Sequence, residues 1–324
     1  MLFNKKKYTL LKSTKVELDI DKDVYSVGEK IKGTFKLTHG GFFEKPEDVK
    51  IYLEARGEEK VEVIEKVLVD VIDPNTNQPV KDPKTGQPVK EVKYVPRSQT
   101  YTFLKKSLSS RVRSLGTPSS DGYVRIQEGT KSAPFEFVLD GNGELFESFN
   151  GNTVKITYLL IGLVDKKSLL AIDARHELPF RVIKKPEIIG QPSKLSETSQ
   201  NKFMTLTLEA GSDNFRRGDV IDGKVTLNNP SNRHIERVEV GIRSVEIAVA
   251  NDVHSETFGA NHVQGLAGSW SSGDSRTFKV KIPPTLTPSF TGINSEYNWE
   301  LSARASSAGS LAEDLFATHQ ITIA

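Results

Sequence analysis

The chain has 324 residues, which is long enough for two domains that bury their cores without cross-links. It contains no cysteine, so disulfides and thiolate metal sites are excluded and a reducing compartment is expected. The net charge of +2 argues against a dedicated nucleic-acid binder.

The N-terminal residues lack the apolar stretch of a signal peptide. The longest apolar run, 158–164, is too short to span a bilayer. A cytoplasmic protein is therefore expected.

Alternating apolar and polar residues recur along the chain, the pattern of half-buried strands. Before residue 184 such runs lie at 15–20, 32–37, 49–55, 135–139, 154–160 and 178–183. After residue 201 they lie at 203–209, 222–227, 237–249, 278–282, 298–305 and 319–324. Many short strands separated by Gly, Pro and Asn/Asp turns indicate an all-β protein built from tandem antiparallel β-sandwiches.

The stretch between these two groups carries two prolines, a glycine and many polar residues, as linkers do. The predicted organisation is a first sandwich at 1–184, a linker at 185–200 and a second sandwich at 201–324.

Two short signals occur in both halves and in the same order. Gly28–Gly33 and Gly218–Gly223 share a Gly-acid-x-x-x-Gly pattern, and Ser148–Gly151 and Ser289–Gly292 share S-F-x-G. A phosphate-binding loop would need a G-K-[ST] sequence, which is missing here. The glycine pairs therefore predict tight turns with positive φ, and the repeated order predicts a duplicated sandwich.

The first half has more residues between its glycine pair and its S-F-x-G motif than the second half has. Gly28 and Ser148 are 120 residues apart, whereas Gly218 and Ser289 are 71 apart, a surplus of 49. The surplus predicts a long hairpin insertion near 60–122, with a nine-residue repeat (Asp73–Lys81, then 82–90) at its tip. The simpler interpretation is a solvated tip, and the alternative is a protruding loop that binds a partner.

One stretch, 102–116, has helical spacing, because its apolar residues lie four, four and three positions apart. These are Leu104, Leu108, Val112 and Leu115. At most one short helix in the N-terminal domain is therefore predicted, with a basic face in water. A second interpretation is that basic residues here and near the N-terminus contact phosphate or anionic lipid. These residues are Lys5, Lys6, Lys7, Lys105, Lys106, Arg111 and Arg113.

The ordered motifs resemble those of the arrestin superfamily over nearly the whole chain. The N-terminal motifs are an aromatic residue before a G-E-x-V-x-G turn, an F-x-F-x-L strand, an S-F-x-G turn and a strand with a central tyrosine: Tyr25, Gly28, Glu29, Ile31, Gly33, Phe135, Phe137, Leu139, Ser148, Phe149, Gly151 and Tyr158. The C-terminal motifs are a G-D-x-I stretch, an N-x-S turn, an I-P-P strand end and a final I-x-I strand: Gly218, Asp219, Ile221, Asn229, Ser231, Ile282, Pro283, Pro284, Ile321 and Ile323.

The resemblance implies two immunoglobulin-like sandwiches in an arrestin fold. It also implies a non-catalytic adaptor or scaffold that binds membrane-protein tails or trafficking components, with peripheral contact to an endosomal or plasma membrane. The alternatives are a structural subunit of a retromer-like membrane coat and a regulator similar to bacterial sporulation-control proteins. No P-P-x-Y motif for ligase recruitment is present. The resemblance suggests polar interdomain residues at Asp173, Arg175 and Arg181.

No sequence motif of an enzyme was found, so the chain is predicted not to be one, with no cofactor and no metal. One metal-dependent alternative rests on His254 and His262, which share a polar stretch with Asp252 and Glu256. The simpler interpretation of that stretch is a solvated loop between strands. The expected partners are other proteins, and nucleic acid is not among them.

Overall fold

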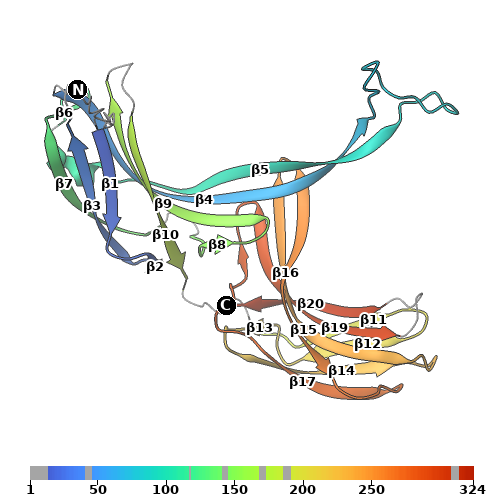
Figure 1. The fold of residues 1–324 in the computed structure, drawn as a ribbon. Coiled ribbons are helices and arrows are strands. Elements are labelled where there is room, and N and C mark those ends of the chain that lie inside the picture. Colours follow the sequence, from blue (N-terminus) through green and yellow to red (C-terminus); the bar gives the residue numbers. More distant parts are fainter. Residues whose placement is uncertain are drawn as a thin grey trace, which may run out of the picture. The chain divides into compact units, whose positions relative to one another are not determined.

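The computed structural model describes residues 14–40, 46–116, 118–140, 145–167, 173–184, 191–307 and 314–324. Nearly all regular structure in these residues is β-strand, so the predicted all-β class is confirmed. The elements are β1 (Thr14–Ile20), β2 (Val24–Ser26), β3 (Lys30–His39), β4 (Glu47–Asp70), β5 (Lys90–Ser107), η1 (Ser109–Leu115), β6 (Val124–Ile126), β7 (Gly129–Val138), β8 (Phe149–Asn150), β9 (Val154–Lys166), β10 (Ala174–Ile183), β11 (Leu195–Gln200), β12 (Thr205–Ala210), β13 (Asn214–Phe215), β14 (Val220–Asn228), β15 (Ile235–Ala250), β16 (Val253–Leu266), β17 (Asp274–Lys281), β18 (Phe290–Thr291), β19 (Ser295–Ser307) and β20 (Leu315–Ile323) (Figure 1).

The chain forms two compact units, each assembled from separate parts of the sequence. Unit 1 comprises Met1–Glu59, Tyr101–Ser148 and Ile156–Lys185, and unit 2 comprises Lys60–Thr100, Phe149–Lys155 and Pro186–Ala324. The outer half of the long hairpin and the turn after β8 thus group with the C-terminal residues.

The predicted linker at 185–200 is too long at its C-terminal end. Its last six residues form β11, which pairs antiparallel with β12 and buries Leu195. The polar composition that suggested a linker belongs to an edge strand with an exposed face, where Ser196, Thr198 and Gln200 alternate with partly covered residues. Residues 185–190 lie outside the described part of the chain.

The strand order largely agrees between the two halves, with β11 as an additional edge strand in the C-terminal half and β6 as an additional strand in the N-terminal half. The N-terminal sheets run β1-β3-β7 and β2-β10-β9-β4-β5, with β6 on β4 and β8 on β9. The C-terminal sheets run β11-β12-β14-β17 and β13-β20-β19-β15-β16, with β18 on β19. In both halves a short strand pairs parallel with the last strand of the sandwich, β2 with β10 and β13 with β20. The predicted duplication is therefore confirmed at the level of topology.

The first glycine of each pair makes the predicted tight turn. Gly28 has φ 80° and Gly218 has φ 92°, a region that favours glycine. Each donates its N–H to a strand end, Gly28 to Leu139 O at 3.0 Å and Gly218 to Ile282 O at 3.1 Å. The acid that follows closes the turn, because Asp219 Oδ2 accepts from Arg216 N–H at 2.8 Å, as Glu29 does from Ser26.

The second glycine of each pair is required for a different reason. A Cβ on Gly33 would lie 2.4 Å from both the Asp19 carbonyl and the Phe135 ring. A Cβ on Gly223 would lie 2.4 Å from the carbonyl of Glu209 and 2.3 Å from the Phe278 ring. Both glycines therefore let an aromatic ring of the neighbouring strand lie flat on the backbone.

The prediction of at most one short helix in the N-terminal domain is confirmed in the described residues, but the helix covers only the second half of 102–116. Residues up to Ser107 continue strand β5, and only the short 3₁₀ helix η1 follows. Leu104, Leu108 and Leu115 are nevertheless buried, as is Val112. A strand end followed by a 3₁₀ turn therefore mimics helical spacing here. No helix in the described residues is long and apolar enough to cross a membrane.

Candidate functional site

Strands β4 and β5 form a long hairpin whose outer part belongs to unit 2 (Figure 1). We call residues 60–100 the distal ribbon. It contains the end of β4, the nine-residue repeat and the beginning of β5. The predicted hairpin insertion is therefore present, with the repeat at its tip.

The two copies of the repeat fold into two small hairpins with the same turn. In the first, Asp73 Oδ1 accepts from Asn75 N–H at 2.7 Å, and in the second Asp82 Oδ1 accepts from Lys84 N–H at 2.7 Å. The residue that closes each turn has positive φ, 55° at Asn77 and 67° at Gly86. Asp-Pro followed by Asn or Gly thus specifies each turn locally.

Three valines join these small hairpins to the ribbon through a closed ring of backbone hydrogen bonds. Val80 N–H donates to Val71 O at 2.7 Å, and Val89 N–H donates to Val80 O at 2.8 Å. Val71 N–H completes the ring by donating to Val89 O at 2.8 Å. The tip is therefore an ordered structure specified by the repeat.

One face of the distal ribbon carries exposed apolar side chains. The guanidinium of Arg97 donates to Glu65 Oε2 at 2.7 Å, so the odd-numbered residues of the two strands share one face and the even-numbered residues share the other. The large apolar residues of the even face are exposed by 64, 64, 46, 42 and 70%: Ile64, Leu68, Ile72, Val92 and Tyr94. Clusters of this kind mark binding surfaces on soluble proteins.

The buried carboxylate of Glu246 on β15 holds the turn after β8 within unit 2. It accepts from the backbone N–H groups of Asn152 at 2.8 Å and Thr153 at 2.9 Å. Glu246 is only 3% exposed, and the N–H groups compensate the cost of burying its charge. The ring of Phe149 packs in the same unit against Tyr297, 4.6 Å between centroids.

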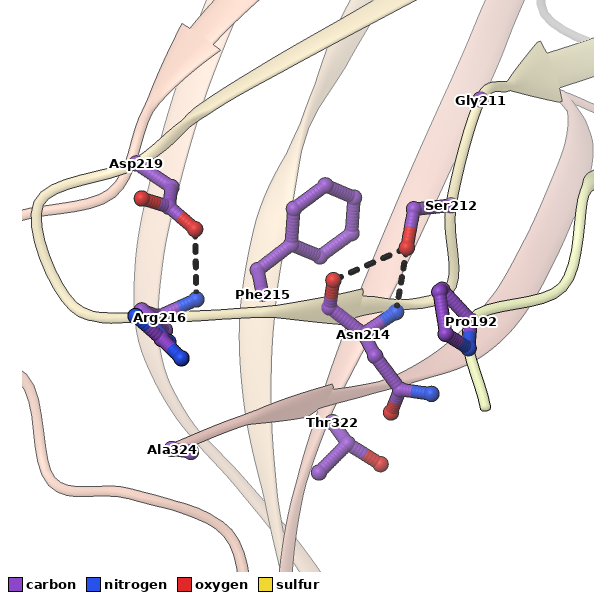
Figure 2. A pocket seen from close by; sticks show the side chains of 9 residues that line it. All are labelled: Pro192, Gly211, Ser212, Asn214, Phe215, Arg216, Asp219, Thr322 and Ala324. Carbon is purple, nitrogen blue, oxygen red and sulfur yellow. Dashed lines mark hydrogen bonds between the residues drawn. The ribbon is translucent and has the colours of Figure 1, made fainter. Parts of the chain in front are cut away.

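A pocket of about 500 Å³ lies in unit 2 beside β13 and the end of β20 (Figure 2). Figure 2 shows hydrogen bonds between Ser212 and Asn214 and between Asp219 and Arg216, which all line the pocket. Ser212 Oγ donates to Asn214 O at 2.8 Å and accepts from Asn214 N–H at 3.0 Å, and Asp219 accepts from Arg216 N–H. The serine hydroxyl is thus engaged by the backbone of the turn.

Two of the predicted basic residues in the described part of the chain have acidic partners. Lys106 pairs with Asp140 and donates to Val138 O at 3.1 Å, whereas Lys105 lies 3.8 Å from Glu54. Arg111 and Arg113 are exposed on η1. Residues 5–7 lie outside the described part of the chain, and the role of all these residues in phosphate or lipid contact stays a prediction.

The three predicted polar residues lie at or next to β10 in unit 1 and have local partners. Asp173 accepts from Lys166 N–H at 3.1 Å, and Arg175 forms an ion pair with Glu177 on the same strand. Arg181 lies opposite Val24 in the parallel pairing with β2. Their interdomain role stays a prediction.

The metal alternative at His254 and His262 is contradicted. The polar stretch that contains them is strand β16, not a loop, and eight residues of strand place their Cα atoms roughly 26 Å apart. Such a distance is too large for one metal ion. No cluster of three potential ligands was found in the described ranges.

Sequence reasoning missed two features of the site, the cap made by Glu246 and the exposed face of the distal ribbon. Glu246 could not be found because its partners are about ninety residues away in sequence. The ribbon did leave a signal, since valine occupies five of the six odd-numbered positions of 61–72, a period-two pattern that continues the strand beyond the usual length of a sandwich strand.

The family described as "Arrestin (or S-antigen), N-terminal domain" matches residues 14–188. This match covers more than half of the chain and spans β1 to β10. No curated protein matches the chain significantly.

Proposed function

The chain belongs to the arrestin family, and from this premise we propose that it is a non-catalytic adaptor that binds other proteins in membrane-protein trafficking or signalling. Its site of action would be the cytoplasm, with peripheral contact to an endosomal or plasma membrane. The observation that carries the proposal is the exposed apolar face of the distal ribbon. Exposed apolar side chains on a rigid sandwich scaffold are typical of surfaces that bind proteins.

The environment of the histidines also supports a non-catalytic role. His176 Nδ1 accepts from Leu18 N–H at 2.8 Å, and His39 hydrogen-bonds with Thr14 at 3.0 Å. His319 contacts the Glu197 carboxylate at 2.8 Å across strands β20 and β11. Each of these rings links two strands, which is a structural use of the side chain.

The proposal is tested by affinity capture with matched surface variants. Val92 on the ribbon and Val220 on β14 are exposed to nearly the same degree, 42% and 44%. We expect Val92→Asp to lose the captured proteins, because a charge disrupts apolar contact, whereas Val220→Asp retains them. Capture that is equal for both variants would refute the ribbon as the binding surface.

The composition of the captured material separates the adaptor from a coat subunit. An adaptor should return membrane proteins or their modifying enzymes in substoichiometric amounts. A single complex of fixed stoichiometry would instead support the alternative of a structural subunit in a retromer-like coat. Capture of membrane vesicles alone, without protein partners, would contradict both.

A further inference from the structure

The outer edge of β4 in the distal ribbon is an open strand edge. Glu62 N–H donates to Thr153 O at 2.7 Å, and β9 begins with the next residue, Val154. Strand β4 therefore continues past the end of β9 for eight residues, up to Asp70. In the part of the chain that the structure describes, no strand pairs with this edge.

The hydrogen bonds of β4 show which of its backbone groups face this edge. Odd-numbered Val71 donates toward β5, whereas even-numbered Glu62 donates to the opposite side. Because backbone groups alternate along a strand, the N–H and C=O groups of Ile64, Lys66 and Leu68 point to the open edge. Those of Asp70 follow the same alternation.

The free edge of β5 differs, because a proline interrupts it. Odd-numbered Val89 bonds toward the end of β4, so the even-numbered residues at the beginning of β5, including Pro96, face outward. Proline has no N–H, and its presence on an edge is a common device against strand addition. The edge of β4 from Ile64 to Ile72 contains no proline. Strand addition to the ribbon is therefore favoured at β4.

The side chains along this edge are self-complementary about Leu68. Lys66 and Asp70 stand two positions before and after it, and Ile64 and Ile72 stand four positions before and after it. In an antiparallel pairing of two copies centred on Leu68, Lys66 faces Asp70 of the other copy, and Asp70 faces Lys66. Opposite charges directly across antiparallel strands stabilise the pair.

We propose that two copies of this chain associate through the outer edges of β4, antiparallel about a two-fold axis at Leu68. Other registers are disfavoured. Centring on Lys66 or Asp70 places like charges opposite each other, and centring on Val67 or Val69 places a charge opposite Leu68. The pairing is isologous, as in most two-fold dimers.

The dimer also extends the exposed apolar face across both copies. Paired residues of antiparallel strands lie on the same side of a sheet. The apolar even faces of the two ribbons therefore join into one face of a four-stranded sheet. A two-stranded ribbon is marginally stable by itself, and four strands stabilise it.

The charge pairs give the first test, by light scattering after size exclusion at up to about 100 μM protein. The wild type should be a dimer. Lys66→Asp and Asp70→Lys should each raise the dimer dissociation constant by about tenfold or more. The reason is that either variant puts two like charges opposite each other in both 66–70 pairs of the dimer. The double variant should restore the dimer, since it reverses both charges of every pair.

A wild type that is monomeric at that concentration would overturn the proposal. This also holds if the ribbon edge binds an extended peptide in place of a second copy. A dimer that neither single variant weakens would overturn it equally. Rescue by the double variant also distinguishes a paired edge from a change in the fold.

The second test uses the lack of cysteine in the natural sequence. Leu68→Cys places two thiols across the axis with Cα atoms about 5.5 Å apart, within the range of a disulfide. It should cross-link on mild oxidation. Lys66→Cys is the matched control, because its two copies lie about 13 Å apart along the strands. Equal cross-linking of both variants would exclude the proposed register.

Discussion

Tyr158 and Trp299 make the same hydrogen bond at equivalent positions of the two sandwiches. Tyr158 donates its hydroxyl to Phe146 O at 2.6 Å, and Trp299 donates its indole N–H to Thr287 O at 2.9 Å. In each case the acceptor lies 12 residues earlier in the chain. Both side chains are fully buried, so each anchors the segment that enters its S-F-x-G turn.

We expect Tyr158→Phe to lower the free energy of unfolding by about 1 kcal/mol, because it removes one buried hydrogen bond and little volume. Trp299→Phe should cost about 3 kcal/mol, since it also leaves a cavity. Calorimetry of both variants measures the difference. Equal costs would contradict this account of the two anchors.

Gly33→Ala and Gly223→Ala should each destabilise the protein by about 1–3 kcal/mol, because the new methyl group overlaps the Phe135 or Phe278 ring. Gly211→Ala is the control, as its Cβ would meet nothing within 4 Å. Urea denaturation gives the three values. A loss for Gly211→Ala similar to the other two would point to a general effect of glycine replacement.

Glu246→Ala should cost about 2–3 kcal/mol, because it removes a charged acceptor and leaves the N–H groups of Asn152 and Thr153 without it. Glu246→Gln keeps one acceptor oxygen and should cost less. Amide hydrogen exchange should show faster exchange at Asn152 and Thr153 in the alanine variant. Unchanged exchange there would show that the cap does not hold the turn.

The contribution of Asp21 to stability should depend on pH. The hydrogen bond from the Tyr25 hydroxyl, at 2.6 Å, holds the pKa of Asp21 below its usual range. Because the pKa of Asp21 is lower in the folded state than in the unfolded state, its ionised carboxylate stabilises the fold above the unfolded pKa of about 4. This stabilisation is lost as the pH falls through the pKa of the folded state.

Tyr25→Phe should therefore cost more stability at pH 7 than at pH 3, as measured by urea midpoints. Tyr158→Phe is the matched control, because its hydroxyl bonds a backbone carbonyl that does not titrate in this range. The equivalent of Tyr25 in the second sandwich is already a phenylalanine, Phe215. A cost of Tyr25→Phe that is the same at both pH values would rule out this linkage.

If the exposed basic residues of η1 contact anionic lipid, the Arg111→Glu, Arg113→Glu double variant should bind vesicles containing phosphatidylserine roughly 30-fold more weakly, from about 1 kcal/mol per basic residue. Sedimentation with such vesicles at low and high salt measures the change. Lys279→Glu in the second sandwich is the control. Failure of the wild type to sediment would end the membrane-contact hypothesis.

The duplicated sandwich could be predicted because its signals are local. Gly28 and Gly218 are fixed by positive φ, and Asp73 and Asp82 specify their turns within a few residues. The apolar spacing from Leu104 to Leu115 predicted a helix that is too long, because burial alone does not distinguish a helix from a strand that ends in a 3₁₀ turn.

The candidate site was less predictable because it depends on contacts that are distant in sequence. The cap of Glu246 joins β15 to a turn of the first half, and the ribbon edge opens only because β9 begins at Val154. Neither fact is encoded in a short window of residues. The alternation of Ile64, Lys66, Leu68 and Asp70 was visible, but it did not show which edge of the strand lacks a partner.

The grouping of the distal ribbon with the C-terminal unit has a consequence during synthesis on the ribosome. Residues 60–100 emerge long before Glu246 and Asn251, whose partners in the first half are Asn152 and Gln99. At about 5–20 residues per second, the delay is on the order of ten seconds. Throughout that time the apolar ribbon is available to chaperones and to the ribbons of neighbouring nascent chains on the same messenger RNA.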